Sequence, residues 1–409
     1  MSNDEQQSSQ DGPRFVFLTD LPPLARNAAT CHGIAAHFIR IMGRRFACVL
    51  THRFRRQIKP EQIAADFAPT PFLFYPDAGG FALKRISQGL TDVVDCFLCL
   101  FAIPKVRRFV RREKPDRIFA LAGASAWFLV IAYIFKKATG LPLDIYLVDD
   151  LRDSAKLQKR WFLPHFVGNL EGFVLRRCAR VLTISQGYAE HLHDLYGVDP
   201  EWLPTPILMD KLEYSPYVAK PGSPEVRTIL FVGGSNDLYL LSLVDLYEVI
   251  QEWNRGDRPF ELKLRILSLT YPQNLVDLLA NTDDLEVELK VQPESLQRQA
   301  RESWVTFLPY SFAPQMKTMV STSFSWKLND SYRSGRPILV YGPAYASIPR
   351  YFIEAGLPLC ATSRDDLVKT IEQVDAADEP ALIDRYREVW HRHHSADAVI
   401  RNLGGGDAG

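Results

Sequence analysis

The chain has 409 residues, of which 47% are hydrophobic, and its 48 Lys and Arg residues balance 48 Asp and Glu residues. This length predicts two domains that each bury a core, and the hydrophobic content excludes a largely disordered protein. No span reaches the roughly 20 apolar residues that a transmembrane helix needs, and no basic region with a cleavage site precedes the first apolar run. We therefore expect a cytoplasmic protein, either soluble or peripheral at the inner face of the membrane.

Charge is distributed unevenly along the chain. Residues 1–200 hold 27 Lys and Arg against 19 Asp and Glu, and the remaining residues hold 21 against 29, so the halves carry formal charges of about +8 and −8. A basic first half attracts anionic lipid or phosphate-bearing acceptors. A merely solvated basic surface has the same composition, so the asymmetry alone leaves both interpretations open.

The first half of the chain alternates expected strands and helices. A strand begins at Phe15, a loop follows at Thr19–Asp20, and a helix is expected over residues 30–42. The remaining expected elements are strands over 46–51, 72–75, 118–121, 143–148 and 181–184 and helices that include 93–101 and 124–138. This βα alternation predicts a parallel sheet with helices on both faces.

Six cysteines are scattered through these expected elements, which is typical of reduced thiols in a cytoplasm. Cys96 and Cys99 form a CxxC pair, but no second Cys or His pair follows at the spacing of a zinc site. Their neighbours are apolar, so we expect the pair to pack in the core. We expect no metal and no cofactor.

Polar residues follow the first strand, where loops at the carboxyl end of a parallel sheet form ligand sites. Asp20 ends the strand, and Asn27, Thr30 and His32 stand around the start of the next helix. We take Asp20 and His32 as catalytic candidates. The alternative for His32 is a structural histidine at a helix start.

Asp149 and Asp150 follow the strand expected over residues 143–148. Because neighbouring side chains on extended backbone diverge, we expect only one of the two to face a site. We take Asp150 as a further catalytic candidate. The alternative is a capped helix with a solvated acidic turn.

A stretch rich in Pro, from Pro204 to Val226, interrupts the pattern and predicts an interdomain connection. A second βα series follows, with strands expected over 229–232, 263–267, 285–290, 305–308 and 338–341. We therefore predict two Rossmann-like doubly wound α/β domains. The expected boundaries are 14–205 for the N-terminal domain, 206–226 for the linker, 227–380 for the C-terminal domain and 381–403 for a final helix.

Two segments of the second domain combine features of a nucleotide site. Gly233-Gly234-Ser235-Asn236 stands between a strand and a helix, where glycines let a phosphate approach backbone amides, although they can also serve turn geometry alone. In the second segment, Ser323 or Ser325 can cap a short helix that carries Lys327 and Asp330 one turn apart. Free amides and an ammonium suit a diphosphate, and a carboxylate suits ribose hydroxyls.

The second segment resembles the donor-binding segment of family 4 retaining glycosyltransferases of the GT-B fold. The matching positions are Lys327, Leu328, Asp330, Tyr332, Ser334, Gly335, Arg336 and Pro337. That family usually has two glutamates eight residues apart, and the first position falls on Thr322 here. The usual basic pair after the glycine loop is also missing, since Ser235 and Leu238-Tyr239 stand in that region. The diphosphate would then depend on Lys327, Arg333, Arg336 or Lys317, of which we favour Lys327.

The resemblance implies a GT-B protein with a central cleft between its two domains and a final helix that crosses back to the first domain. It implies transfer of a sugar, with retention, from a nucleotide-sugar donor to a hydroxyl of a glycan or lipid-linked saccharide. The expected catalytic residues are Asp20, His32, Asp150 and Lys327, and the expected donor-binding residues are Gly233, Gly234, Ser235, Asn236, Ser325, Lys327 and Asp330. The alternatives are a non-catalytic relative that binds a nucleotide sugar or a partner enzyme, and a nucleotide-sugar epimerase on the same fold.

Two basic amphipathic segments, residues 98–112 and 156–166, combine Lys and Arg with aromatic residues. Such a combination is suited to a membrane surface with anionic headgroups, and ordinary surface charge is the alternative. We expect no nucleic-acid partner, because no known nucleic-acid-binding motif accompanies these segments.

Overall fold

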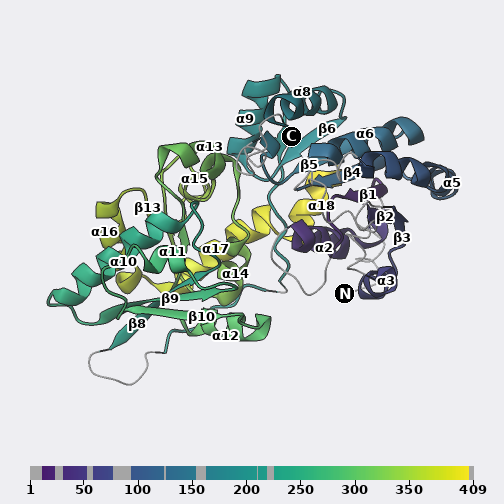
Figure 1. Cartoon of the computed structure of the whole chain (residues 1–409). Helices are drawn as coiled ribbons and strands as arrows, with labels where there is room; N and C mark the ends of the chain where they lie inside the picture. The colour runs from purple at the N-terminus through teal and green to yellow at the C-terminus, as the bar shows by residue number, and fades with distance from the viewer. Residues whose placement is uncertain are drawn as a thin grey trace. The chain divides into compact units, whose positions relative to one another are not determined.

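Two parallel β-sheets organise the chain, one in each of two structural units (Figure 1). The computed structural model describes residues 12–23, 31–52, 59–76, 94–123, 126–152, 163–209, 211–218 and 225–404. Unit 1 comprises Met1–Leu208 and His393–Gly409, and unit 2 comprises Met209–Arg392. The end of the chain therefore returns to the first unit.

Unit 1 contains a seven-stranded sheet in the order β3-β2-β1-β4-β5-β6-β7. Its strands are β1 (Phe15–Thr19), β2 (Phe46–His52), β3 (Phe72–Tyr75), β4 (Arg117–Ala122), β5 (Leu143–Leu147), β6 (Arg180–Thr183) and β7 (Glu201–Trp202). Its helices are α2 (Cys31–Met42), α3 (Pro60–Asp66), α5 (Ile103–Glu113), α6 (Ala126–Thr139), α8 (Leu163–Leu175), α9 (Gln186–Tyr196) and α18 (Ala396–Gly404), with 3-10 turns η1 (Gly43–Arg45) and η3 (Cys99–Ala102). The central strand β1 is buried along its whole length, and its Phe17 stacks on Phe46 with ring centroids 4.5 Å apart.

Unit 2 contains a six-stranded parallel sheet in the order β10-β9-β8-β11-β12-β13. Its strands are β8 (Val226–Val232), β9 (Glu261–Ser268), β10 (Leu285–Leu289), β11 (Val305–Pro309), β12 (Ile338–Tyr341) and β13 (Cys360–Ala361). Its helices are α10 (Leu240–Arg255), α11 (Gln273–Val276), α12 (Pro293–Glu302), α13 (Lys317–Thr322), α14 (Lys327–Ser334), α15 (Ser347–Glu354), α16 (Arg364–Ala376) and α17 (Glu379–His393), with the 3-10 turn η4 (Pro314–Met316).

Each sheet reverses its strand order beside its first strand, between β1 and β4 in unit 1 and between β8 and β11 in unit 2. In doubly wound sheets, loops leave in opposite directions at such a switch point, and ligands bind outside the carboxyl ends of the strands. The predicted α/β class with two doubly wound domains is confirmed.

Two predicted helices differ from the structure. The final helix is broken into α17 and α18, because the buried His394 between them bonds through Nδ1 to the carbonyl of Thr205 at 2.7 Å and accepts the N–H of Ile207 at 3.0 Å. The helix expected over 93–101 is helical over 94–98 and continues through η3 into α5. Cys96 and Cys99 are buried there, and Cys99 donates to the carbonyl of Cys96 at 3.0 Å.

Part of the expected linker packs as an element of unit 2. The N–H of Ser215 donates to the carbonyl of Gly335 at 3.1 Å, and Arg387 of α17 donates to the carbonyl of Leu212 at 2.9 and 3.1 Å. Among the residues that the structure describes, no helix has the length and apolar character of a membrane span.

Candidate functional site

A small cavity lies at the switch point of the unit 2 sheet. The space in it that a water molecule can occupy is about 10 Å³. Its walls come from β8, β11, α12 and α14 and consist of Leu230, Val232, Ala300, Thr306, Phe307, Leu308, Lys327, Asp330 and Ser331. The apolar members belong to the strands and α12, and α14 supplies the two charged residues. The topology therefore places Lys327 and Asp330 where a doubly wound sheet binds ligands.

Lys327, the first residue of α14, lies against the glycine loop that follows β8. A Cβ on Gly233 would lie 2.5 Å from Cε and 3.1 Å from Nζ of Lys327, and Gly233 has a φ of +128°. The backbone conformation therefore favours glycine there, and a Cβ would displace the end of the lysine side chain. The ammonium lies 3.8 Å from the ring centroid of Tyr239 and 5.4 Å from that of Phe231. No described residue gives it an ion pair or a hydrogen bond.

The glycine loop presents free backbone amides beside this ammonium. The N–H of Gly233 continues the sheet by donating to the carbonyl of Leu267 at 2.8 Å. The next three N–H groups, from Gly234 to Asn236, have no acceptor among the described residues. A Cβ on Gly234 would meet no atom within 4 Å, so the loop is open at that point. Successive free amides next to an ammonium form an anion-binding arrangement.

The remaining loop residues hold its shape. Ser235 is buried, and its hydroxyl donates to Oδ1 of Asn274 at 2.5 Å, while the amide of Asn274 returns a bond to the carbonyl of Ser235. The carbonyl of Asn236 accepts the N–H groups of Tyr239 and Leu240 at 2.9 and 2.8 Å, which starts α10. The side chain of Ser235 is therefore engaged inside the protein, and the loop offers its backbone to a ligand.

Asp330 lies one helical turn after Lys327 and is half-buried. Its Oδ1 accepts only long hydrogen bonds, from Asn329 at 3.4 Å and from Gln297 at 3.5 Å. Burial raises the pKa of this carboxyl to about 6, against the opposing effect of Arg333 and Lys327. The buried Oδ1 of Asn329 has no hydrogen-bond donor among the described residues. The side-chain oxygens of Asp330 and Asn329 thus lack short hydrogen bonds from the described residues.

The start of α14 corrects one expectation. The N–H groups of Lys327 and Leu328 donate to the hydroxyl and the carbonyl of Ser325 at 3.3 and 3.2 Å, and the N–H of Asn329 donates to the carbonyl of Trp326 at 3.0 Å. The N-cap residue of α14 is Trp326, so Ser325 accepts one amide of the first turn without being the cap residue. The prediction of free amides at this helix start is wrong for these three groups. The free amides lie on the glycine loop instead.

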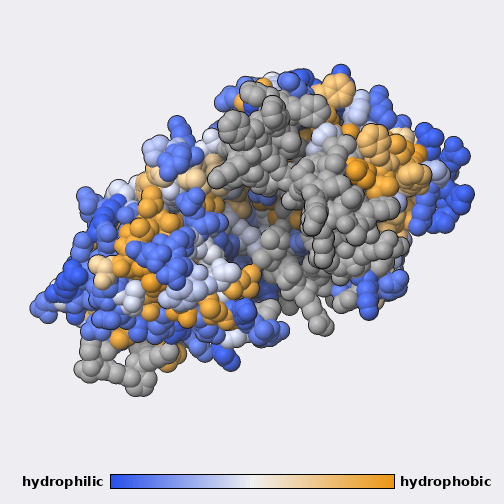
Figure 2. Space-filling model, viewed as in Figure 1, coloured by the Kyte–Doolittle hydropathy of each residue, from blue (hydrophilic) through white to orange (hydrophobic). Residues whose placement is uncertain are grey.

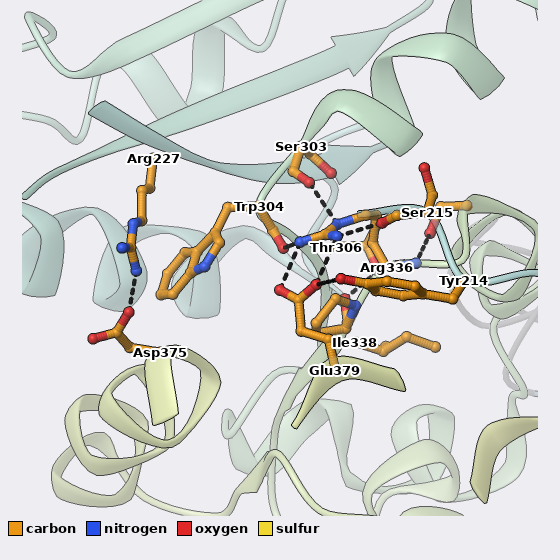
Figure 3. A network of polar contacts seen from close by, with 12 residues as sticks. Tyr214, Ser215, Arg227, Ser303, Trp304, Thr306, Arg336, Ile338, Asp375 and Glu379 are labelled. Atoms are coloured by element: carbon orange, nitrogen blue, oxygen red, sulfur yellow. Dashed lines mark hydrogen bonds and ion pairs between the residues drawn. The ribbon is translucent and has the colours of Figure 1, made fainter. Parts of the chain in front are cut away.

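Arg336 is a structural residue. Its side chain is 0% exposed and donates to the carbonyls of Ser303 and Trp304, each at 3.0 Å, and to that of Ser215. It also binds both carboxylate oxygens of Glu379, at 2.8 and 2.9 Å (Figure 3). These contacts exclude a direct role in binding phosphate.

The other two cations considered for the diphosphate, Lys317 and Arg333, are exposed and do not line the cavity. Thr322, which stands where the resembling family has its first acid, is buried and donates its hydroxyl to the carbonyl of Thr318 at 3.0 Å. Of the cations considered, only Lys327 therefore lines the cavity, and the position of the missing acid faces back into α13.

The candidates of unit 1 lie at the carboxyl edge of its sheet. Asp150 is buried, and its Oδ2 lies 3.0 Å from Nε2 of His191 on α9. Glu171 on α8 is also buried and accepts the hydroxyl of Tyr196 at 2.7 Å. Burial raises the pKa of Glu171 to about 7, assisted by the nearby charge of Asp150. The structure thus brings Asp150 into a buried polar cluster that also contains His191, Glu171 and Tyr196.

Asp20 and His32 have backbone contacts in the same unit. Asp20 is buried at the end of β1, and its carbonyl lies 2.5 Å from Nε2 of His52. His32 is half-buried, with Nδ1 2.5 Å from the carbonyl of Pro22. The latter contact fixes the ring, as a structural histidine would require. Asn27, Thr30 and residues 156–162 lie outside the described residues.

Three residues of these clusters escaped the sequence analysis. Tyr239 lies beneath the ammonium of Lys327, Gln297 bonds to Asp330, and His191 pairs with Asp150. Only His191 had a signal: β5 and β6 are neighbours, so the helix after β6 must pass the residues that follow β5. The aromatic at position 239 stands where the resembling family has a basic residue, and no local pattern marks Gln297.

Comparison with known proteins gives the family of one segment and the fold of the whole. Residues 80–203 match a family described as a glycosyl transferase 4-like domain. The structure is similar to a lipopolysaccharide outer core galactosyltransferase, WaaB, with a TM-score of 0.60, 14% identity and coverage of 96% of this chain and 98% of that one. It is also similar to sucrose-phosphate synthase from Thermosynechococcus elongatus, with a TM-score of 0.62, 11% identity and coverage of 96% and 97%.

A third similar structure is described as trehalose-6-phosphate from E. coli bound with UDP-2-fluoro glucose. It has a TM-score of 0.57 and 9% identity, and the match covers 94% of this chain and 95% of that one. No curated protein is recognisably similar in sequence. At these identities the structural likenesses establish the fold, which is GT-B. The match of residues 80–203 to a glycosyl transferase 4-like domain supports a glycosyltransferase.

Proposed function

We propose that unit 2 binds a nucleotide-sugar donor and that the enzyme transfers its sugar to an acceptor hydroxyl. The diphosphate would lie on the amides of residues 234–236 and against Lys327, and the ribose hydroxyls would bond to Asp330. One observation carries this proposal: a half-buried ammonium rests on the glycine loop above Tyr239, and no described residue forms a direct ion pair with it. A cation withdrawn from water in this way gains most from a charged ligand.

The same groups have a role in the reaction. As the bond from the sugar to the diphosphate breaks, negative charge accumulates on the leaving phosphate. Amides and an ammonium fixed beforehand around that phosphate stabilise the transition state more than the ground state. Lys327 is held by Gly233 and two rings, so little reorganisation is needed when the charge develops.

For the acceptor side, we propose Asp150 with its partner His191, and we retain Asp20 and His32 as further candidates. A buried carboxylate paired with an imidazole can orient a hydroxyl and accept its proton. The acceptor would be a glycan or a lipid-linked saccharide, the transfer would retain the donor's configuration, and the enzyme would work at the inner face of the membrane. The resemblance described above is the support for these finer assignments.

The donor site is tested by thermal unfolding of the full chain with UDP and a panel of nucleotide sugars. UDP is the first probe because a protein of similar fold is bound with UDP-2-fluoro glucose. A ligand at about 100 times its Kd stabilises the folded state by about 2.7 kcal/mol. We expect Lys327→Met to weaken UDP binding by at least about tenfold, the usual minimum for a charge-assisted bond of about 1.5 kcal/mol.

Lys317→Met is the matched control, because Lys317 is also a unit 2 lysine over a tyrosine, with Nζ 5.5 Å from the ring of Tyr345. It should leave the UDP shift unchanged. Equal binding by wild type and Lys327→Met would contradict the donor site. No shift with any nucleotide or nucleotide sugar would contradict the proposal as a whole.

The acceptor side is tested separately with Asp150→Asn. UDP release is measured with the best donor, in the presence and absence of acceptors from a panel of saccharides and lipid-linked saccharides. We expect the acceptor-dependent part to fall by about 10²-fold or more, the usual contribution of a general base, while the UDP shift stays at the wild-type value. An unchanged acceptor-dependent rate would remove Asp150 from the mechanism.

A further inference from the structure

The helical stretch from residue 94 to the end of α5 exposes an apolar surface at its beginning. Phe97 is 64% exposed, Leu100 43% and Phe101 77%. Their spacing of three and four residues places them on one side of a helix. The opposite side, which includes Cys96, Cys99 and Ala102, is buried in unit 1. One side of the stretch therefore faces the core, and these three apolar side chains form a second side that is exposed to solvent.

The continuation of the same stretch is basic. Five exposed cations follow within two turns: Lys105, Arg107, Arg108, Arg111 and Arg112. The acid of α5, Glu113, pairs with Arg112 at 2.8 Å and with Arg14 at 3.6 Å. Lys105, Arg108 and Arg111 have no ion pair with a described residue. Uncompensated positive charge thus continues directly from the apolar side chains.

The neighbouring helix extends this combination. Arg107 donates to the carbonyl of Ala138 at 2.6 Å, which joins α5 to the end of α6, where Lys136 and Lys137 stand. Hydrophobic residues gather over the region of α5 and α6, with hydrophilic residues around them (Figure 2). Val106 and Phe109 bury the inner side of α5, so the outer side is held on a fixed element.

We infer that this docking face, formed by Phe97, Leu100, Phe101, Lys105, Arg108 and Arg111, binds an anionic lipid bilayer. The aromatic side chains would enter the region between headgroups and acyl chains, and the cations would lie against headgroup phosphates. Charge complementarity selects an anionic surface, and the apolar end selects a lipid. A nucleic acid would satisfy the cations but would leave the apolar end in water. The inference does not rest on the proposed donor site, because every residue involved belongs to unit 1.

The test is co-sedimentation of the full chain with phosphatidylcholine vesicles, with and without phosphatidylglycerol, at low and high salt. We expect binding only to the anionic vesicles and a marked loss at high salt, since exposed charges are screened. Phe97→Ser combined with Phe101→Ser should weaken binding at least about tenfold at either salt concentration. Arg108→Glu combined with Arg111→Glu should do so mainly at low salt.

The matched controls are Leu269→Ser and Arg298→Glu, which change an exposed leucine and an exposed arginine of unit 2. They should bind as the wild type does. The inference is overturned by absence of vesicle binding in the wild type, by equal binding to neutral vesicles, or by docking-face variants that bind like the controls. The UDP shift of each variant separates this test from the donor site, because it should be unchanged whether or not vesicles are bound.

Discussion

In the segment from Lys327 to Arg336, the charged side chains at the two ends differ in how fully the protein supplies their hydrogen-bond partners. At the carboxyl end, Arg336 is withdrawn from solvent, and three carbonyls and one carboxylate fill its bonding capacity. At the amino end, Lys327 and Asp330 are half-buried, the ammonium lies against rings and a glycine without a direct ion pair, and the carboxylate accepts only long bonds. A buried charge whose partners are all internal supports the architecture, whereas one without them has bonding capacity left for a ligand.

The largest effect on the free energy of unfolding should come from substitution of Arg336, whose hydrogen-bond partners are all internal. Arg336→Met would leave the carboxylate of Glu379 and the three carbonyls without their donor, and breaking a buried ion pair from one side destabilises by about 3–5 kcal/mol. We expect a loss of that size in the free energy of unfolding of unit 2, measured with denaturant on the full chain.

Arg364→Met is the control for this loss. Arg364 also binds two carboxylates, those of Glu248 and Glu252, but on the surface. Its removal should change stability by no more than about 1 kcal/mol. If the two substitutions destabilise equally, the contrast between the ends of the segment does not depend on burial.

The fold could be predicted from the sequence, and so could the residues that meet at the proposed donor site. Strands of apolar residues alternating with helices dictate parallel sheets, and the strand order places the loop after β8 near the carboxyl end of β11. Gly233 and Lys327 meet for that reason. The loop itself has a sequence signal in Gly233, because its positive φ favours glycine.

What could not be predicted depends on where bonding partners lie in three dimensions. From the sequence, Arg336 is a candidate phosphate ligand. In the structure it binds Glu379 and Ser215, which are distant in sequence. The sequence predicts free amides at the start of α14. In the structure the oxygens of Ser325 and the carbonyl of Trp326 accept hydrogen bonds from three of them. The break before α18 follows from burial of His394 against Thr205, which no local helical pattern reports.

The smallest effect on the free energy of unfolding should come from substitution of Asp330 at the amino end. This substitution should stabilise the protein, whereas loss of Arg336 destabilises it. Burial raises the pKa of Asp330 from 3.8 to about 6, so folding favours the protonated form. This contribution to stability is complete below about pH 4 and is lost as the pH rises through 6. At pH 8 the charged side chain therefore destabilises the folded state, by about 1 kcal/mol because solvent partly screens this half-buried group.

Asp330→Asn should thus stabilise the chain by about 1 kcal/mol at pH 8 and by nothing measurable at pH 4, while weakening UDP binding. Denaturant unfolding at both pH values and the UDP thermal shift give the three quantities needed. Asp277→Asn, an exposed carboxyl on the same unit that accepts a bond from Gln273 at 2.6 Å, should show neither effect. A variant that loses stability at pH 8 would mean that Lys327 and Arg333 already satisfy the carboxylate. The two ends of the segment would then differ only in exposure, and the case for a ligand at Asp330 would fall.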